Sequence, residues 1–172
     1  ILHTVAALII VGGLAPIVAI VHRRDAGKGG PRSLSLHMKI ALGMTAVLLF
    51  GGMLLFAAFE WHGTLAGLSP VDRLHNAWFQ SVTLRTAGFN SVGLVDVQPE
   101  TLSVMLAWML IGGAPGGTAG GIKVTTVAVI GLVVVNSVRG RWGAEAFGRR
   151  LSPQIVYKSL VITVVAGAAI FV

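Results

Sequence analysis

The sequence predicts an all-α membrane protein, and three observations lead to that prediction. Of the 172 residues, 55% are hydrophobic and only 11% are charged, whereas a soluble domain carries roughly 25% charged residues. Several apolar segments approach the length of about 20 residues that a spanning helix needs. The 23 glycines lie largely in apolar sequence, which is typical of membrane helices that pack closely. Cysteine is absent, so disulfides and thiolate metal sites are excluded.

Four segments are candidate spanning helices. They cover residues 1–21, 38–59, 98–138 and 152–172. The third is interrupted by "GGAPGGTAGG" at 112–121. Both ends of the chain lie inside apolar runs, so we expect it to be a piece of a longer membrane protein.

The Lys and Arg residues predict the orientation of these helices. They concentrate in the linkers 22–39 and 139–158, whereas the segment 60–100 holds only Arg73 and Arg85. Basic linkers stay in the cytoplasm, which puts 60–100 outside. This arrangement requires that 72–91 does not cross the membrane.

Residues 72–91 are therefore expected to be re-entrant. Asp72 favours the positive end of a short helix, and apolar and small residues recur at helical spacing up to Ser81. The polar sequence that follows is tolerated at membrane depth only where its backbone is buried in protein or lines water. An amphipathic helix lying on the outer surface is the alternative.

The segment 112–121 cannot continue a helix comfortably. A glycine costs about 1 kcal/mol relative to alanine in a helix interior, and a proline such as Pro115 about 3 kcal/mol. Its freed backbone groups must find water or protein partners. A kink that only aids packing is an alternative.

A phosphate-binding loop is a further alternative for this segment, and the sequence disfavours it. Gly116 and Gly121 have the spacing of such a loop, but Ile122 stands before Lys123. No buried strand leads into the segment, which the motif requires.

Two stretches resemble a known family. "NAWFQSVTLRTAGFNS" at 76–91 and "IGGAPGGTAGGIKVTT" at 111–126 are similar to the Trk/Ktr/HKT superfamily of potassium-uptake membrane subunits, and "SLHMK" at 35–39 is a weaker match. The resemblance covers the whole chain. It implies one polypeptide with four helix–pore-loop–helix repeats around a single pore, each with a re-entrant half-helix.

The resemblance also implies a division of this chain around the third repeat. Residues 1–35 would be the last helix of the preceding repeat plus a cytoplasmic linker, 36–138 the pore repeat, and 139–172 a linker and the start of the next repeat. Within the pore repeat we expect an outer helix 38–59, a pore helix 72–83, a filter 84–91, and a broken inner helix 98–138 with its loop at 112–121.

The polar segment after the short helix then has a chemical explanation. Selectivity filters replace the hydration shell of an ion with backbone carbonyls, and glycine supplies the dihedral angles that this needs. Potassium is expected at the backbone of Gly88. The proposed carbonyl donors are Thr86, Ala87, Gly88 and Phe89. An ordinary turn glycine is the alternative for Gly88.

Arg85, Asn90 and Ser91 are expected to support the filter. A cation in a cation pore would repel the ion, so Arg85 should point away from the axis and contact carbonyls or a carboxylate. The candidate carboxylates are Glu60, Asp72 and Asp96. Asp96 and Glu100 either concentrate cations at the pore mouth or are solvated loop acids.

For the broken segment, the family resemblance favours an intramembrane gating loop. The residues assigned to it are Gly112, Gly113, Pro115, Gly116, Gly117, Thr118, Gly120, Gly121 and Lys123. An ionisable residue inside a membrane is a functional candidate by default. Lys123 would either anchor the loop to an acid elsewhere or form an electrostatic barrier in the closed pore.

The implied function is potassium translocation by a multi-pass protein of the bacterial inner membrane, and not an enzymatic reaction. The resemblance implies a homodimer of full-length subunits and a cytosolic regulatory ring, which would bind the nucleotide. We expect no cofactor in this chain, with K⁺ as the permeant ion. A non-conducting membrane scaffold and a sodium-permeable family member are the alternatives.

The basic and aromatic stretch 139–150 is expected to rest on anionic lipid or to dock a regulatory subunit. Its position beside a membrane helix disfavours nucleic acid as a partner. The histidine spacing predicts no zinc site.

Overall fold

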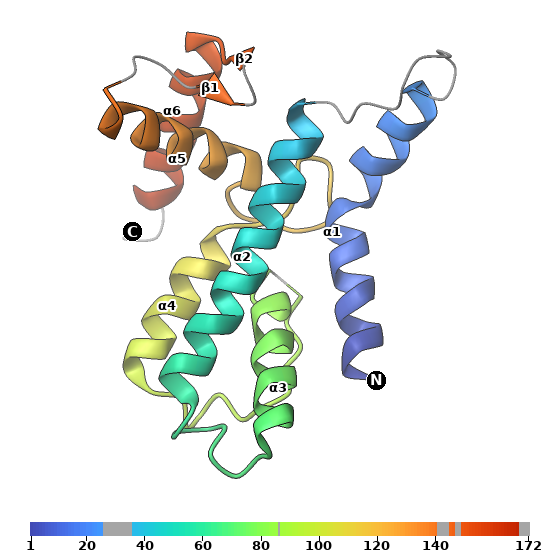
Figure 1. The fold of residues 1–172 in the computed structure, drawn as a ribbon, viewed down its shortest axis with the longest axis vertical. Coiled ribbons are helices and arrows are strands. Elements are labelled where there is room, and N and C mark those ends of the chain that lie inside the picture. Colours follow the sequence, from blue (N-terminus) through green and yellow to red (C-terminus); the bar gives the residue numbers. More distant parts are fainter. Residues whose placement is uncertain (26–35, 86, 141–144, 147–148, 169–172) are drawn as a thin grey trace.

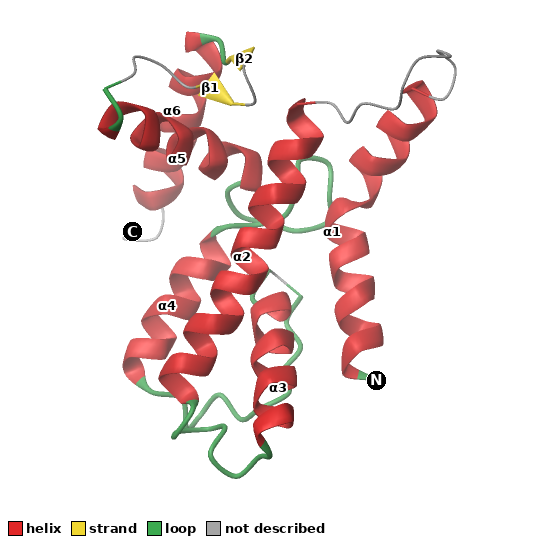
Figure 2. Cartoon of the chain, viewed as in Figure 1, coloured by secondary structure: helices red, strands yellow, loops and turns green. Residues whose placement is uncertain are grey.

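The computed structural model describes residues 1–25, 36–85, 87–140, 145–146 and 149–168. These residues form six α-helices (Figure 1 and Figure 2). The helices are α1 (Leu2–Asp25), α2 (Leu36–Glu60), α3 (Pro70–Thr83), α4 (Pro99–Leu110), α5 (Val124–Val138) and α6 (Pro153–Ala168). The predicted all-α class is confirmed for this part of the chain.

One pair of very short strands was not predicted. β1 (Glu145–Ala146) and β2 (Arg149–Arg150) pair antiparallel, with Glu145 opposite Arg150. Alternation of polar and apolar residues indicates a strand only over several residues. A two-residue strand therefore leaves no readable pattern in the sequence.

Helix α2 is the centre of the fold (Figure 1). α3 and α4 pack against it, and α5 contacts it as well as α6. Within the described residues, α2 is the one helix that is long and apolar enough to cross a membrane by itself. Its 25 residues give a length of about 37 Å, compared with a hydrocarbon core of about 30 Å.

At Gly52, helix α2 is in close contact with both α3 and α4. A Cβ atom at Gly52 would lie 2.5 Å from Ser81 Oγ on α3 and 2.8 Å from Trp108 Nε1 on α4. Both neighbours also bind the backbone of α2: the Ser81 hydroxyl donates to Leu49 O at 2.6 Å, and Trp108 Nε1 donates to Leu48 O at 3.0 Å. The missing side chain of Gly52 thus admits two hydrogen bonds that join the three helices.

A buried carboxylate joins the end of α2 to the start of α4. Glu60 has no exposed surface. Its Oε2 accepts from the backbone N–H of Thr64 at 3.0 Å, and its Oε1 accepts from the N–H of Gln98 at 3.0 Å and the hydroxyl of Thr101 at 2.6 Å. Gln98 is the N-cap residue of α4 and has no side-chain cap of its own. Glu60 supplies that cap and places a negative charge at the positive end of α4.

Candidate functional site

The segment that leaves α3 folds back over the end of that helix. The N–H of Ala87 donates to Thr83 O at 3.1 Å, and the N–H of Phe89 donates to Thr83 Oγ1 at 2.9 Å. Gly88 has φ +78°, a conformation that residues with a side chain rarely adopt. Among the described residues, no atom beyond the two chain neighbours lies within 4 Å of the place that a Cβ of Gly88 would take, so the positive φ is what requires glycine here. Thr86, a predicted carbonyl donor, lies outside the described residues.

Arg85 is buried behind this segment. Its side chain is 8% exposed, and Nη2 donates to the hydroxyl of Thr45 on α2 at 3.4 Å. Glu60 and Asp72, two of the candidate carboxylates, accept hydrogen bonds elsewhere: Glu60 from α4, and Asp72 from the Ser69 hydroxyl at 2.6 Å. Within the described residues, Nε of Arg85 has no hydrogen-bond partner.

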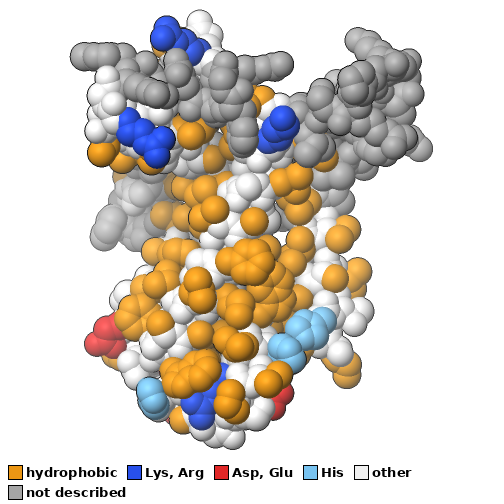
Figure 3. All heavy atoms as spheres, in the orientation of Figure 1, with side chains coloured by type: hydrophobic (Ala, Val, Ile, Leu, Met, Phe, Trp, Pro, Cys, Tyr) orange, Lys and Arg blue, Asp and Glu red, His pale blue; other side chains and the backbone are white. Residues whose placement is uncertain are grey.

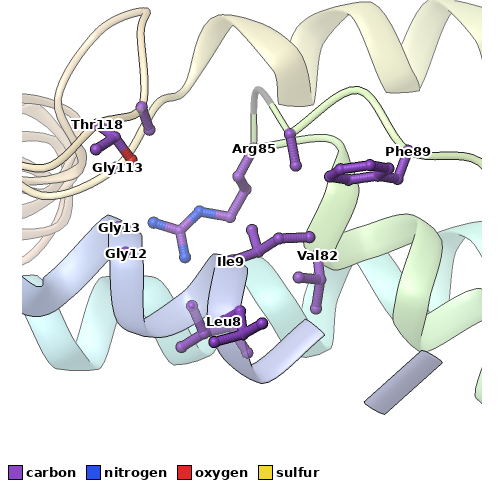
Figure 4. A pocket seen from close by; sticks show the side chains of 12 residues that line it. Leu8, Ile9, Gly12, Gly13, Val82, Arg85, Phe89, Gly113 and Thr118 are labelled. Carbon is purple, nitrogen blue, oxygen red and sulfur yellow. The ribbon is translucent and has the colours of Figure 1, made fainter. Parts of the chain in front are cut away.

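A cavity of about 210 Å³ brings three distant parts of the chain together. Its walls are α1, the segment after α3, and the loop between α4 and α5. Figure 4 shows the guanidinium of Arg85 directed into the space between Gly12 and Gly13 of α1 and Gly113 and Thr118 of the loop. The two stretches singled out in the sequence therefore face one cavity.

The loop between α4 and α5 is closed at its base. Ile111 and Ile122 form a parallel bridge, in which the N–H of Gly112 donates to Ile122 O and the N–H of Ile122 donates to Leu110 O, both at 2.9 Å. A Cβ on Gly112 would overlap the carbonyl oxygen of Gly120. The helix break is thus a compact loop with its own hydrogen bonds rather than a simple kink.

The tip of the loop rests on α1. The N–H of Ala114 donates to Gly13 O at 3.3 Å. A Cβ on Gly117 would overlap the same carbonyl oxygen, and one on Gly113 would lie 3.3 Å from it. Glycine at these positions lets two backbones touch.

Lys123 is held within the loop itself. Its Nζ donates to Ala119 O at 2.6 Å. This contact is to a carbonyl close by in sequence, whereas the sequence suggested an acid elsewhere or a barrier in the pore. The contact joins the N-cap residue of α5 to the preceding part of the loop.

Comparison with known proteins identifies the family. A family of cation transport proteins, TrkH, matches residues 8–166. This chain belongs to the TrkH family. The matched residues include both the segment after α3 and the loop between α4 and α5, so the resemblance seen in the sequence is confirmed. TrkH proteins are cation transport proteins, which makes this chain part of a membrane protein.

Three relatives show how much of a TrkH-family protein is present. The chain is 39% identical over 159 residues to the potassium/sodium uptake protein NtpJ of Enterococcus hirae, covering 92% of this chain and 35% of the relative. It is 39% identical over 168 residues to the Ktr system potassium uptake protein B of Vibrio alginolyticus, covering 96% and 36%. It is 37% identical over 142 residues to the Bacillus subtilis protein of the same name, and the match covers 81% of this chain and 32% of the relative. The chain thus spans about a third of the length of these relatives.

Three residues of the site in this TrkH-family chain were missed by sequence reasoning. Thr83, rather than Asn90 or Ser91, bonds the segment that carries Gly88; the Ser91 hydroxyl is buried with no hydrogen-bond partner within the described residues. Thr45 contacts Arg85, and Gly13 receives the loop. Only Gly13 left a signal, as part of a Gly-Gly pair in an apolar run.

Proposed function

We propose that the full-length protein translocates potassium ions across the bacterial inner membrane as the pore subunit of a Ktr/Trk-type uptake system. This chain would supply one helix–pore-loop–helix repeat. The observation that carries the proposal is the meeting of the Gly88 segment and the loop between α4 and α5 around one cavity. In the proposed pore a filter and a gate act in series on one ion path, and two segments that line one cavity are placed to do so.

The burial of α3 supports a re-entrant helix over one lying on the membrane surface. α3 has 14 residues, or about 21 Å, which is too short to span. Its C-terminal half is buried, including the polar residues Gln80 and Ser81. A surface helix would bury one apolar face, whereas a helix inserted among others buries its end on several sides.

The backbone around Gly88 supports the filter role. Gly88 and Phe89 are exposed in this chain, although their neighbours Leu84 and Arg85 are buried. A single repeat would leave its filter segment uncovered, because the other three repeats supply the rest of the ring. The carbonyls of Ala87, Gly88 and Phe89, with that of Thr86, are the proposed ligands of K⁺.

The buried charge of Arg85 fits a supporting role behind the filter. Its guanidinium points into the cavity beside α1, and a hydroxyl, rather than a second charge, is its bonded neighbour on α2. Placed there, the positive charge would stabilise carbonyls of the loop that lines the same cavity.

The loop between α4 and α5 is the proposed gate. Its contacts with the described part of α1 include one hydrogen bond at 3.3 Å and a close approach of glycines, which are weak enough to exchange. We further propose that subunits form homodimers and that a cytosolic ring binds nucleotide and moves this loop. The Ktr system names of the relatives support a subunit that works with other components.

Discrimination between potassium and sodium at Gly88 tests the proposal. Gly88→Ser in the full-length protein should reduce the preference for K⁺, because a side chain is strained at φ +78° and intrudes at the coordinating ring. Competition between K⁺ and Na⁺ for uptake of rubidium, in cells lacking other uptake systems, measures it.

Gly67→Ser is the matched control. Gly67 lies in the exposed loop before α3, does not have a positive φ, and has open space around its Cβ position. The control should leave ion preference unchanged. A well-expressed Gly88→Ser protein with the wild-type preference would exclude Gly88 from the filter, and no rubidium uptake by the wild-type full-length protein would favour the non-conducting scaffold.

A further inference from the structure

A second cavity shares no lining residue with the first. Its volume is about 480 Å³, and α2, α5 and α6 form its walls. This volume is within the range of about 300–1,000 Å³ that is usual for ligand pockets. Most of the lining is apolar and is contributed by Leu36, Ile40, Val129, Leu151, Ile155 and Ile162.

The polar part of this cavity is basic. Lys158 on α6 and His37 on α2 belong to the lining, and both side chains are exposed. Three hydroxyls, from Thr125, Thr126 and Ser159, complete the lining. The cavity therefore combines an ammonium group, an imidazole and hydroxyl donors with an apolar interior, and no carboxylate belongs to its described lining.

Two observations place the mouth of the cavity at the level of lipid headgroups. Tyr157, next to Lys158, is 70% exposed, and tyrosine concentrates where a membrane meets water. Figure 3 shows Lys and Arg side chains gathered at the end of the molecule that holds α5, α6 and the start of α2. An excess of Lys and Arg predicts the cytoplasmic side of a membrane protein.

We propose that this cavity binds an anionic phospholipid, with the headgroup phosphate at Lys158 and the upper part of an acyl chain against the apolar wall. Basic pockets between membrane helices on the cytoplasmic side suit anionic headgroups. The apolar wall favours an amphiphile over free phosphate, which would gain nothing from six apolar side chains. This site requires only that the protein is embedded in a membrane, so it stands apart from the proposed transport function.

Native mass spectrometry of the full-length protein, purified in mild detergent and supplied with phosphatidylglycerol, tests the assignment. Lys158→Glu should reduce retained phosphatidylglycerol at least tenfold relative to the wild type, because the phosphate then meets a like charge. Phosphatidylcholine, which has no net charge, should be retained poorly by both proteins.

Arg139→Glu is the matched control. Arg139 is the C-cap residue of α5 and does not line the cavity. Its replacement by glutamate changes the charge by the same amount as Lys158→Glu. This variant should retain phosphatidylglycerol like the wild type. Equal loss from the two variants would mean that general surface charge holds the lipid, and would overturn the site.

A second variant tests the apolar wall and decides the matter if Lys158→Glu does not fold. Ile155→Trp fills the cavity and keeps every charge, so it should also lose the lipid. Retention of phosphatidylglycerol by this variant would overturn the proposal. Displacement of the lipid by millimolar inorganic phosphate would do so too, since the cavity would then take free phosphate.

Discussion

The carbonyl oxygen of Gly13 on α1 accepts a hydrogen bond from the N–H of Ala114 at 3.3 Å. Sequence separates these two residues by the whole of α2, α3 and α4. Through this contact α1 holds the tip of the loop between α4 and α5. The strength of this contact should decide how often the loop leaves its observed position.

Gly117→Ala should weaken that contact. Its new Cβ would overlap Gly13 O, and relieving an overlap of this kind costs about 1–3 kcal/mol in a packed region. Since 1.4 kcal/mol is a factor of ten in an equilibrium, potassium uptake in the absence of the cytosolic partner should rise about tenfold. Uptake by cells lacking other potassium systems measures this.

Gly13→Ala is the control for the loop contact. Crowding is absent at Gly13: among the described residues, no atom beyond its neighbours in the helix lies within 4 Å of its Cβ position. Its carbonyl is unchanged, so this variant should behave like the wild type. If Gly117→Ala is well expressed and its uptake still depends fully on the partner, α1 does not restrain a gate.

Deletion of residues 116–120 should remove the obstruction and leave both half-helices. The bridge between Ile111 and Ile122 and its hydrogen bonds use none of the deleted residues. Uptake should become independent of the cytosolic partner, and the preference for K⁺ over Na⁺ should survive because the filter segment is untouched. Low, partner-dependent uptake by a well-expressed deletion protein would exclude the gating role.

Gly52→Ala should destabilise the helix core. The added methyl would lie 2.5 Å from Ser81 Oγ and 2.8 Å from Trp108 Nε1, which predicts a loss of about 1–3 kcal/mol. Gly43→Ala in the same helix has open space and should instead stabilise by about 0.5–1 kcal/mol. Melting temperatures of the two proteins in detergent should shift in opposite directions; a shift of the same sign and size would contradict the packing described for Gly52.

Glu60→Gln should loosen the junction of α2 and α4. Both carboxylate oxygens of Glu60 accept hydrogen bonds from backbone N–H groups. In the glutamine variant an NH₂ group replaces one of these oxygens, so two hydrogen-bond donors face each other. An unsatisfied buried donor costs about 1–3 kcal/mol, so the melting temperature should fall. Glu100→Gln, an exposed acid in the first turn of α4, should change it little, and equal melting temperatures for the two variants would show that Glu60 is not a cap.

The helical class and the break near Pro115 follow from local properties, which a sequence displays. Length and hydropathy indicate α2, and clustered glycines indicate that α4 cannot run into α5. These inferences need no knowledge of which segments are neighbours.

The long-range contacts, in the candidate site and in the helix core, could not be predicted because they depend on which segments are neighbours. Gly52 and Gly117 resemble any other glycine in apolar sequence, and only the fold shows that Trp108 and Gly13 lie against them. Glu60 could be recognised as an unusual acid at the end of a long apolar helix. Its partners Gln98 and Thr101, however, lie 38 and 41 residues later in the chain.

The closed base of the loop has a consequence for the speed of any rearrangement. Because the N–H of Gly112 donates a hydrogen bond to Ile122 O, the tip between these residues can change shape while the ends of α4 and α5 keep their separation. Such a change is a loop motion, with a timescale of nanoseconds to microseconds, rather than a collective movement of helices, which takes microseconds to milliseconds. The two half-helices would then serve as a fixed frame, and any delay in a response would come from the proposed partner and not from the loop itself.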